Sequence, residues 1–331
     1  MSITQKKDKS LNHQHDQILF KQRLAAFLVI IGVYVVLGIM TRGRFLVPHN
    51  LWMVLSNTVP NAFMVLGFCF IFTMGLIDLS LGAILILGCN AGGILAVHLG
   101  LGYFGLIIGA CLVVALLELF NLKMVLVTKI PSWIFGLGMA MVYESIGAMY
   151  NVSQIDQGKQ VVALANQYRS LGNQPVNIII LLIGVFIAYI IFNKTNIGFK
   201  LRAVGSNREV ASMMGIDIEK TILFAGLIGA LFIGMSAAIT ESYAGRVVPS
   251  TGLNSIALIF TPLAGFLLAQ ALSKLINLTL AALLGSFIIT SLFNALTIIG
   301  VPSGTWQKVV MGAVVIVCGM LSARDEKGVV K

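Results

Sequence analysis

The chain has 331 residues, of which 58% are hydrophobic and only 10% are charged, and its mean hydropathy is +0.97. A soluble domain carries roughly 25% charged residues, so a water-soluble fold of this length would leave too much apolar surface exposed. The formal net charge is +10, but the basic residues form short clusters between apolar runs. That distribution is typical of a membrane protein and argues against nucleic-acid binding.

Apolar runs recur along the chain at lengths close to the roughly 20 residues that a helix needs to span a bilayer. They predict an all-α, multi-pass membrane domain over 24–322 with ten spans. The expected spans are 24–40, 53–72, 81–98, 104–122, 131–149, 175–192, 221–240, 253–271, 275–296 and 306–321.

The basic residues give the expected orientation, because Lys and Arg favour the cytoplasmic side of a membrane. Ten spans with a cytoplasmic N-terminus place sixteen of the 22 Lys and Arg residues inside and the other six outside. The outer six are Arg42, Arg44, Lys159, Arg169, Arg246 and Lys308. Both termini are then cytoplasmic, with tails over 1–23 and 323–331, an outer loop over 150–174 and an inner segment over 193–220.

The first informative stretch is 73–82, which reads TMGLIDLSLG and contains Gly75, Asp78, Ser80 and Gly82. An ionised carboxylate beside a membrane span is costly, so Asp78 is expected to face protein or water. Asp78 and Ser80 are suited to cap the helix that begins near position 81, which is the favoured interpretation. Contact between Asp78 and a transported solute is the alternative.

The second stretch is the inner segment 196–216. Ser206-x-x-Glu209 fits a capping box, and Gly215 fits the position just after a helix. The helix between them would place Val210, Met213 and Met214 on one face. Such a short helix must lean on something: either the underside of its own membrane domain or a groove on a partner protein.

Pro131, Glu144 and Glu241 are interpreted from their positions relative to the expected spans. Asn121 opens a stretch in which Pro131 fits the first turn of a helix. Glu144 and Glu241 lie near the expected outer ends of spans, where they could bind a polar solute or reach water, and we favour water.

These stretches resemble the permeases of ribose-type ATP-binding-cassette (ABC) importers over nearly the whole chain. That family's T-x-G-G-I-D-L-S-x-G signature matches 73–82, with Met74 and Leu76 as departures. Its inner N-x-x-G-x-x-x-x-A-x-G-x-N-x-x-A-A-x-x-x-G-I signature matches 196–216, with Val210 replacing one alanine. Its N-G…K-I-P-x-F-I-x-T-L-G stretch matches 121–138, where Leu122 and Gly136 depart. A late glycine-rich turn of the family is absent from 261–270.

The resemblance implies a permease in a bacterial inner membrane that takes in a sugar or a similar small polar solute. Its implied partners are cytoplasmic ATPase subunits, a second permease copy or a paralogous permease, a periplasmic solute-binding protein, the solute and membrane lipid. The loop over 150–174 is then periplasmic and 193–220 is the coupling segment. The residues expected to couple to the ATPase are Gly205, Ser206, Asn207, Glu209, Val210, Met213, Met214 and Gly215; those expected in the pathway or its structural motifs are Gly75, Asp78, Ser80, Gly82, Asn121 and Pro131.

Two other classes of function are open to such a chain. An ion-driven carrier needs acidic residues inside the pathway; only Asp78, Glu118 and Glu144 are candidates, and the sequence gives no sign that they pair. A membrane enzyme needs a catalytic cluster, and none appears at a usable spacing. No GxxxxGK[ST] phosphate loop occurs, so we expect no cofactor and no ATPase site in this chain, with ATP bound by the partner.

Overall fold

The computed structural model describes residues 24, 27–157, 161–273, 275–302 and 304–323. Within these residues the fold consists of helices and contains no strand, which confirms the all-α prediction. The expected N-terminal tail and nearly all of the expected C-terminal tail lie outside the described residues.

Ten α-helices of more than ten residues follow a helix over Phe27–Met40 in the described part of the chain. They are α2 (Pro48–Ile71), α3 (Leu81–Val97), α4 (Gly102–Thr128), α5 (Ser132–Asp156), α6 (Val176–Lys194), α7 (Asn196–Ser206), α9 (Ile218–Ala244), α10 (Ala257–Leu272), α11 (Leu278–Ile299) and α12 (Thr305–Ala323). The short helices are η1 (Arg44–Leu46), η2 (Phe72–Met74), η3 (Asn166–Tyr168), η4 (Ser170–Gly172), α8 (Arg208–Met213) and η5 (Asn254–Ile256).

Six helices in the described residues are long and apolar enough to cross a membrane, fewer than the ten spans expected. They are Pro48–Met74, Gly102–Thr128, Val176–Lys194, Ile218–Ala244, Asn254–Leu272 and Leu278–Ile299. The helices Phe27–Met40, Leu81–Val97 and Trp306–Ser322 are shorter apolar stretches. Helix α5 has 25 residues, but polar residues lower its hydropathy.

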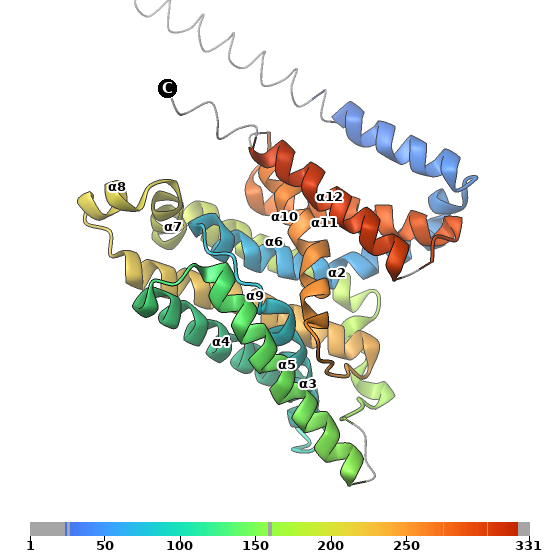
Figure 1. The fold of residues 1–331 in the computed structure, drawn as a ribbon. Coiled ribbons are helices and arrows are strands. Elements are labelled where there is room, and N and C mark those ends of the chain that lie inside the picture. Colours follow the sequence, from blue (N-terminus) through green and yellow to red (C-terminus); the bar gives the residue numbers. More distant parts are fainter. Residues whose placement is uncertain (1–23, 25–26, 158–160, 274, 303, 324–331) are drawn as a thin grey trace, which may run out of the picture.

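Helices α2 and α9 form the centre of the bundle. In their most apolar stretches, 78% and 67% of the residues are buried, against 33–39% for the other four long helices. The two helices pack against each other, with α3 and α4 lying on α9 and α10 and α11 lying on α2 (Figure 1). The apolar side chains of the remaining helices point outward, where lipid rather than water is the solvent.

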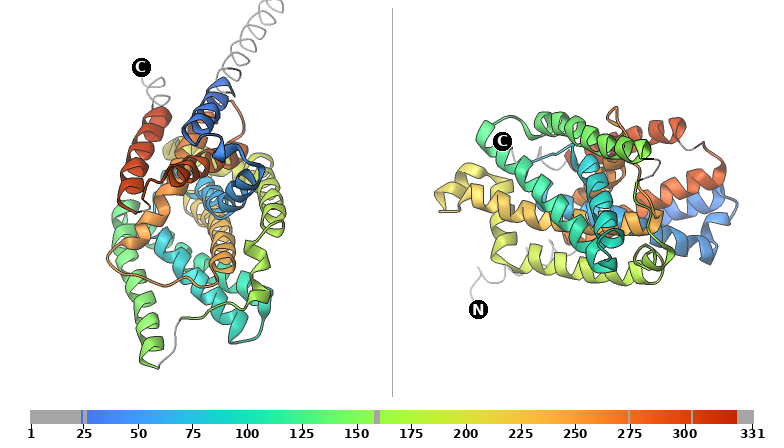
Figure 2. Two further views of the ribbon diagram at one scale, coloured as in Figure 1. Left: turned by 90° about the vertical axis from the view of Figure 1, so that its right-hand side faces the viewer. Right: turned by 90° about the horizontal axis from the view of Figure 1, so that it is seen from below.

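The packing reveals an internal repeat that we did not find in the sequence. The pairs α3–α4, α3–α5, α3–α9 and α4–α9 have counterparts in α10–α11, α10–α12, α10–α2 and α11–α2. Helices α2 to α5 therefore correspond to α9 to α12. Because α2 and α9 run in opposite directions, the two sets are inverted relative to each other, an arrangement common among transporters (Figures 1 and 2).

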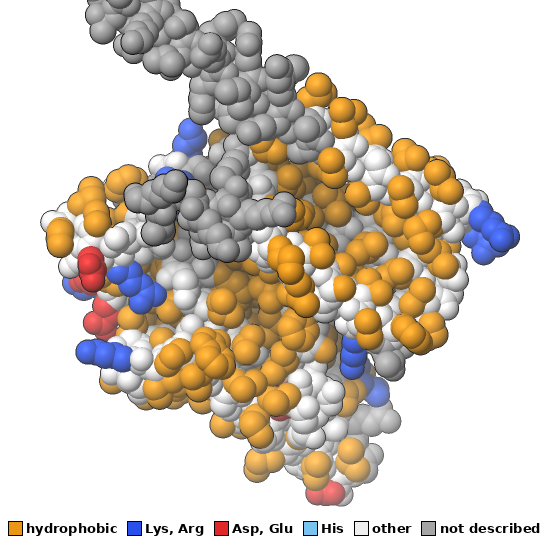
Figure 3. Space-filling model, turned by 45° about the horizontal axis from the view of Figure 1, so that its top comes forward, with side chains coloured by type: hydrophobic (Ala, Val, Ile, Leu, Met, Phe, Trp, Pro, Cys, Tyr) orange, Lys and Arg blue, Asp and Glu red, His pale blue; other side chains and the backbone are white. Residues whose placement is uncertain are grey.

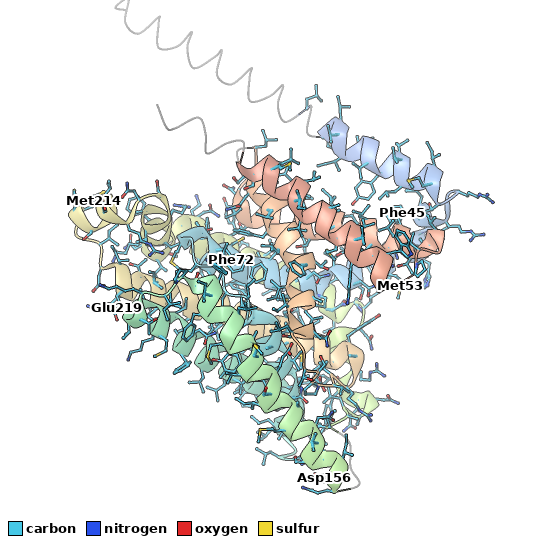
Figure 4. All side chains as sticks on the ribbon, in the orientation of Figure 1. Phe45, Met53, Phe72, Asp156, Met214 and Glu219 are labelled. Carbon is cyan, nitrogen blue, oxygen red and sulfur yellow. The ribbon has the colours of Figure 1, made fainter. Side chains whose placement is uncertain are left out.

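The bundle has two ends that differ in what they carry. One end, here the α8 end, carries α7, α8 and the start of α9, with Met214 and Glu219 (Figure 4). The opposite end, here the Asp156 end, carries Met53 and Asp156 (Figure 4). Charged side chains gather toward these ends, and hydrophobic side chains dominate the face between them (Figure 3).

Candidate functional site

The inner segment predicted over 193–220 forms two helices, α7 and α8, at the α8 end. Helix α7 begins after Thr195, whose hydroxyl accepts from the Gly198 backbone N–H, and it buries Leu201 and Val204. Helix α8 follows, and α9 begins after Asp217, whose carboxylate accepts from the Lys220 backbone N–H at 3.0 Å. That backbone hydrogen bond holds the pKa of the Asp217 carboxyl below its usual range.

The predicted capping box is wrong, whereas the predicted stop is confirmed. Ser206 is the last residue of α7, and Asn207 is the residue that caps α8, accepting from the backbone N–H groups of Glu209 and Val210. Gly215 has φ +77°, and it donates to Ser212 while Ile216 donates to Ala211. These are the two hydrogen bonds of a Schellman motif, which favours glycine at this position.

The predicted apolar face of α8 does not pack against this chain. Met213 is 85% exposed, Met214 is 64% exposed and Val210 is 50% exposed. Ala211, on the other side of the helix, is 1% exposed and supplies the contact with the protein's own bundle. Of the two alternatives open from the sequence, this exposure favours a groove on a partner protein over packing beneath the chain's own membrane domain.

The α7–α8 junction lies directly on the turn that follows α2. Arg208 donates a hydrogen bond from Nη2 to the Met74 carbonyl at 3.0 Å. A Cβ at Gly205 would overlap the Thr73 carbonyl oxygen, so glycine permits this close approach. A cavity of about 370 Å³ beside the junction brings the three signature stretches together: Gly75 and Leu76 from the first, Arg208 from the second, and Lys129 to Trp133 from the third.

The turn over 75–80 is tied to α4 and α5 by a buried polar network. Gly75, with φ +75°, ends η2 and redirects the chain, which leads into α3 through Asp78 and Ser80. Asp78 accepts from the Ser80 backbone N–H and, at 2.8 Å, from Asn121, which also donates to the Ser80 hydroxyl. Tyr143 of α5 donates to the Asn121 side-chain oxygen at 2.8 Å.

This network corrects the expected capping of α3. Ser80 occupies the N-cap position but makes no side-chain capping bond, and Asp78 bonds the Ser80 backbone one residue before the helix. Pro131 likewise lies at the N-cap of α5, one residue before the expected first turn, and the hydroxyl of Ser132 accepts from the Ile77 backbone N–H. The main role of these residues is to connect the turn before α3 with α4 and α5, and capping of a single helix is secondary.

Glu118 of α4 completes the buried group and is a residue to which the sequence assigned no partner. Its side chain is fully buried, and it lies against the carboxyl group of Asp78. Neither of its oxygens receives a hydrogen bond from an N–H or hydroxyl group of the described residues. Two carboxyl groups can bond each other only through a proton that one of them holds, so the pair is a poorly satisfied contact.

We expect Glu118→Gln to raise the stability of the purified permease by about 1–2 kcal/mol. An amide side chain of the same shape donates an N–H to Asp78, and this replaces a contact between two acceptors. The thermal unfolding midpoint in detergent measures the change. Glu209→Gln, on the exposed surface of α8, is the matched control and should leave the midpoint unchanged. A lower midpoint for Glu118→Gln would show that the Glu118 carboxyl has a stabilising partner.

The chain between α9 and α10 folds back along α5. Gly245, with φ +73°, ends α9; Pro249 then lies against Gly147 of α5 and the next residues reach Glu144, one turn back along α5. The Glu144 carboxylate accepts from the backbone N–H groups of Leu253 at 2.8 Å and Ser255 at 2.7 Å.

The interpretation that Glu144 and Glu241 reach water is wrong. They are 4% and 1% exposed, and Glu241 accepts from the Val247 backbone N–H at 3.1 Å. Both carboxylates hold the returning segment 246–255, in which Pro249 and Ser255 are buried and whose position against α5 and α3 was not predicted from the sequence. Gly82 of α3 completes the junction, because a Cβ there would overlap the Ser255 carbonyl oxygen. The first turn of α3 thus meets the first turn of the segment that leads into α10.

Comparison with known proteins agrees with this architecture. Residues 50–319 match the family model described as the permease component of branched-chain amino acid transport systems. The ribose import permease of Bacillus subtilis (strain 168) is 26% identical over 316 residues, which cover 92% of this chain and 93% of the relative. The D-allose transport permease of Escherichia coli (strain K12) is 23% identical and covers 90% of each chain.

Other relatives match over a shorter region, and no solved structure matches. The xylose transport permease of Escherichia coli (strain K12) is 28% identical over 165 residues, which are 50% of this chain and 40% of that protein. The chain thus spans less than half the length of the xylose permeases it matches. The family model, in contrast, covers the three signature stretches, the α7–α8 segment and nearly the whole of helices α2 to α11. This chain belongs to the family of permease components of branched-chain amino acid transport systems.

Proposed function

We propose that this chain is the membrane-spanning permease subunit of an ABC importer that carries a sugar or a similar small polar solute across a bacterial inner membrane. The relatives that align along nearly their whole length are named as ribose, D-allose and autoinducer 2 permeases, which supports a sugar or a similar small polar solute over an amino acid. The chain itself forms the pathway, and a periplasmic binding protein delivers the solute.

The observation that carries the proposal is the exposed apolar face of α8. Val210, Met213 and Met214 project from the α8 end, beyond the helices long enough to span the membrane (Figure 4). A short helix with an unpaired Met-rich face is suited to a groove on a partner protein. Arg208 and Gly205 contact the turn that precedes α3. A movement of the partner would therefore be transmitted through this turn to α3.

The proposed topology has about ten spans, with both termini and the coupling segment in the cytoplasm. The sixteen-to-six distribution of basic residues supports this orientation. The short helices Phe27–Met40, Leu81–Val97 and Trp306–Ser322 complete the count together with α5. The proposed assembly has two permeases, identical or paralogous, and two ATPase subunits that supply the nucleotide site.

The pairing of Asp78 with Glu118 removes one argument against an ion-driven carrier, because paired acids were not expected from the sequence. The family match and the exposed face of α8 remain in favour of the ATP-driven mechanism. Neither acid is among the residues that line the large cavity described below.

Reconstitution tests the proposed function directly. Proteoliposomes that contain the permease, its ATPase and its binding protein should accumulate a radiolabelled sugar such as D-ribose, D-xylose or D-allose when ATP is supplied. Uptake should persist when a protonophore and a sodium ionophore collapse the ion gradients. Uptake that needs an ion gradient and continues without ATPase would instead establish a secondary carrier.

A further inference from the structure

A cavity of about 860 Å³ lies between α2 and the second repeat. Its walls come from α2, from η5 and α10, from α11 and from α12. Its polar lining residues are Asn61, Asn254, Thr261, Thr290, Gln307 and Lys308. Pockets for small molecules commonly measure about 300–1,000 Å³, so this one has room for a single small solute.

The position of the cavity is that of a solute site in other transporters. It is lined by Leu253, Asn254 and Ile256, which lie directly before α10. Thr290 and Asn61 lie in the middle part of α11 and α2, on opposite sides of the boundary between the two repeats. Secondary transporters built from inverted repeats bind their solutes near the membrane centre, at the interface between the two repeats.

Three of the polar groups of the cavity are side-chain amides that already donate to neighbours in the protein. Asn254 donates its amide N–H to the Thr251 carbonyl at 2.6 Å, and Gln307 donates to Thr297 and to the Val301 carbonyl. Asn61 donates to the Thr290 hydroxyl at 3.5 Å. The amide oxygens of these three residues have no donor among the described residues, and a ligand rich in hydroxyl donors would satisfy them.

The apolar lining matches the rest of such a ligand. Phe260 and Phe293 line the cavity together with Met311, Val315 and Ile316. Aromatic rings give flat apolar surfaces against which the C–H faces of a sugar ring can pack. Lys308 is the one charged residue among those that line it, and no Asp or Glu does. A free amino acid would bring an ammonium group that finds no acidic partner here.

We propose that this cavity holds a neutral monosaccharide during transport, with the amide oxygens of Asn61, Asn254 and Gln307 accepting its hydroxyl groups. The inference rests on the proposed function and adds the site and the charge state of the solute. Thr290 orients the Asn61 amide and is a positioning residue, and Met311 sets the width of the cavity.

The test uses the complete reconstituted transporter and radiolabelled D-ribose, D-xylose and D-allose. Thr290→Val and Asn61→Leu each remove polar groups from the wall, and Met311→Trp fills the space without removing any. Each should reduce ATP-driven uptake at least tenfold at saturating loaded binding protein, since a site built for hydroxyl groups loses strongly when a polar partner is removed. ATPase activity stimulated by the binding protein should remain within about twofold of wild type, because α8 is unchanged.

Ser286→Ala is the matched control. Ser286 lies on the same helix as Thr290, donates to the Ala282 carbonyl within that helix and does not line the cavity. Its uptake should equal that of the wild type. If the wild type transports sugar and Thr290→Val, Asn61→Leu and Met311→Trp all transport it at the wild-type rate, the site is overturned and the proposed function stays intact.

Two further outcomes also overturn the site. Met311→Trp could change the number of permease copies in the complex while its uptake per complex stays normal, which would make the cavity a contact between copies. A lipid that co-purifies with the wild type and is displaced in Met311→Trp at normal uptake would make the cavity a lipid groove. Absence of ATP-driven uptake of all three sugars in the wild type would contradict the proposed function itself.

Discussion

Replacing Met213 and Met214 together with Asp is expected to abolish binding of the ATPase and, with it, solute uptake. The two side chains are 85% and 64% exposed in the isolated chain, so the substitution costs the permease little on its own. In the proposed complex both side chains enter a groove of the partner. Burying two unpaired carboxylates there costs several kcal/mol, which is enough to reduce the affinity more than a thousandfold.

A pull-down of ATPase with the variant, with membrane levels measured in parallel, tests this expectation. Met213→Leu combined with Met214→Leu is the control, because it keeps the volume and the apolar character of both side chains. The control should recover the ATPase normally, and the Asp variant should reach normal membrane levels. Normal ATPase recovery by the Asp variant would show that α8 is not the docking helix.

Gly82→Ala is expected to destabilise the permease by about 3 kcal/mol, near the upper end of what overpacking usually costs. The added methyl group would overlap the Ser255 carbonyl oxygen, which is backbone and cannot rotate away. Ser255 is held in turn by Glu144, so the strain would spread to the start of α10. The thermal unfolding midpoint in detergent should fall clearly below that of the wild type.

Gly138→Ala is the matched control for this substitution. Gly138 is also helical, but a Cβ built there has open space around it. Alanine favours a helix by up to about 1 kcal/mol over glycine, so the control should be neutral or slightly stabilising. An equal midpoint for Gly82→Ala and Gly138→Ala would mean that the start of α3 and the segment before α10 do not meet as closely as the structure places them.

Local features of the chain could be predicted from sequence where they depend on neighbours in sequence. Gly215 ends α8 because its φ of +77° is unfavourable for other residues, and the pattern of Val210, Met213 and Met214 correctly placed three apolar side chains on one face. The choice of cap failed because two good candidates stood side by side. Ser206 and Asn207 both favour that position, and only the backbone at Asn207, which is extended, decided between them.

Features that depend on the chain turning back could not be predicted in this way. Glu144 and Glu241 were assigned to water because each lies near the end of an apolar run, and nothing local indicates that 246–255 folds back to meet them. Glu118 is a similar case: its partner Asp78 is far away in sequence. The inverted repeat was missed for a related reason, because the repeats share packing while the residues that make the contacts differ.

The contact between the Glu144 carboxylate and the segment before α10 also affects whether phosphorylated sugars can leave the cell through the permease. The free N-terminus of a helix attracts phosphate, because its unpaired N–H groups carry partial positive charge. Here two of those groups, at Leu253 and Ser255, are already bonded to Glu144, so the interior offers an anion little attraction at this point. A sugar that is phosphorylated after import gains a charge of about −2. We expect the permease to pass neutral sugars and to hold back their phosphates, so vesicles loaded with a sugar phosphate should retain it while the complete transporter imports the free sugar.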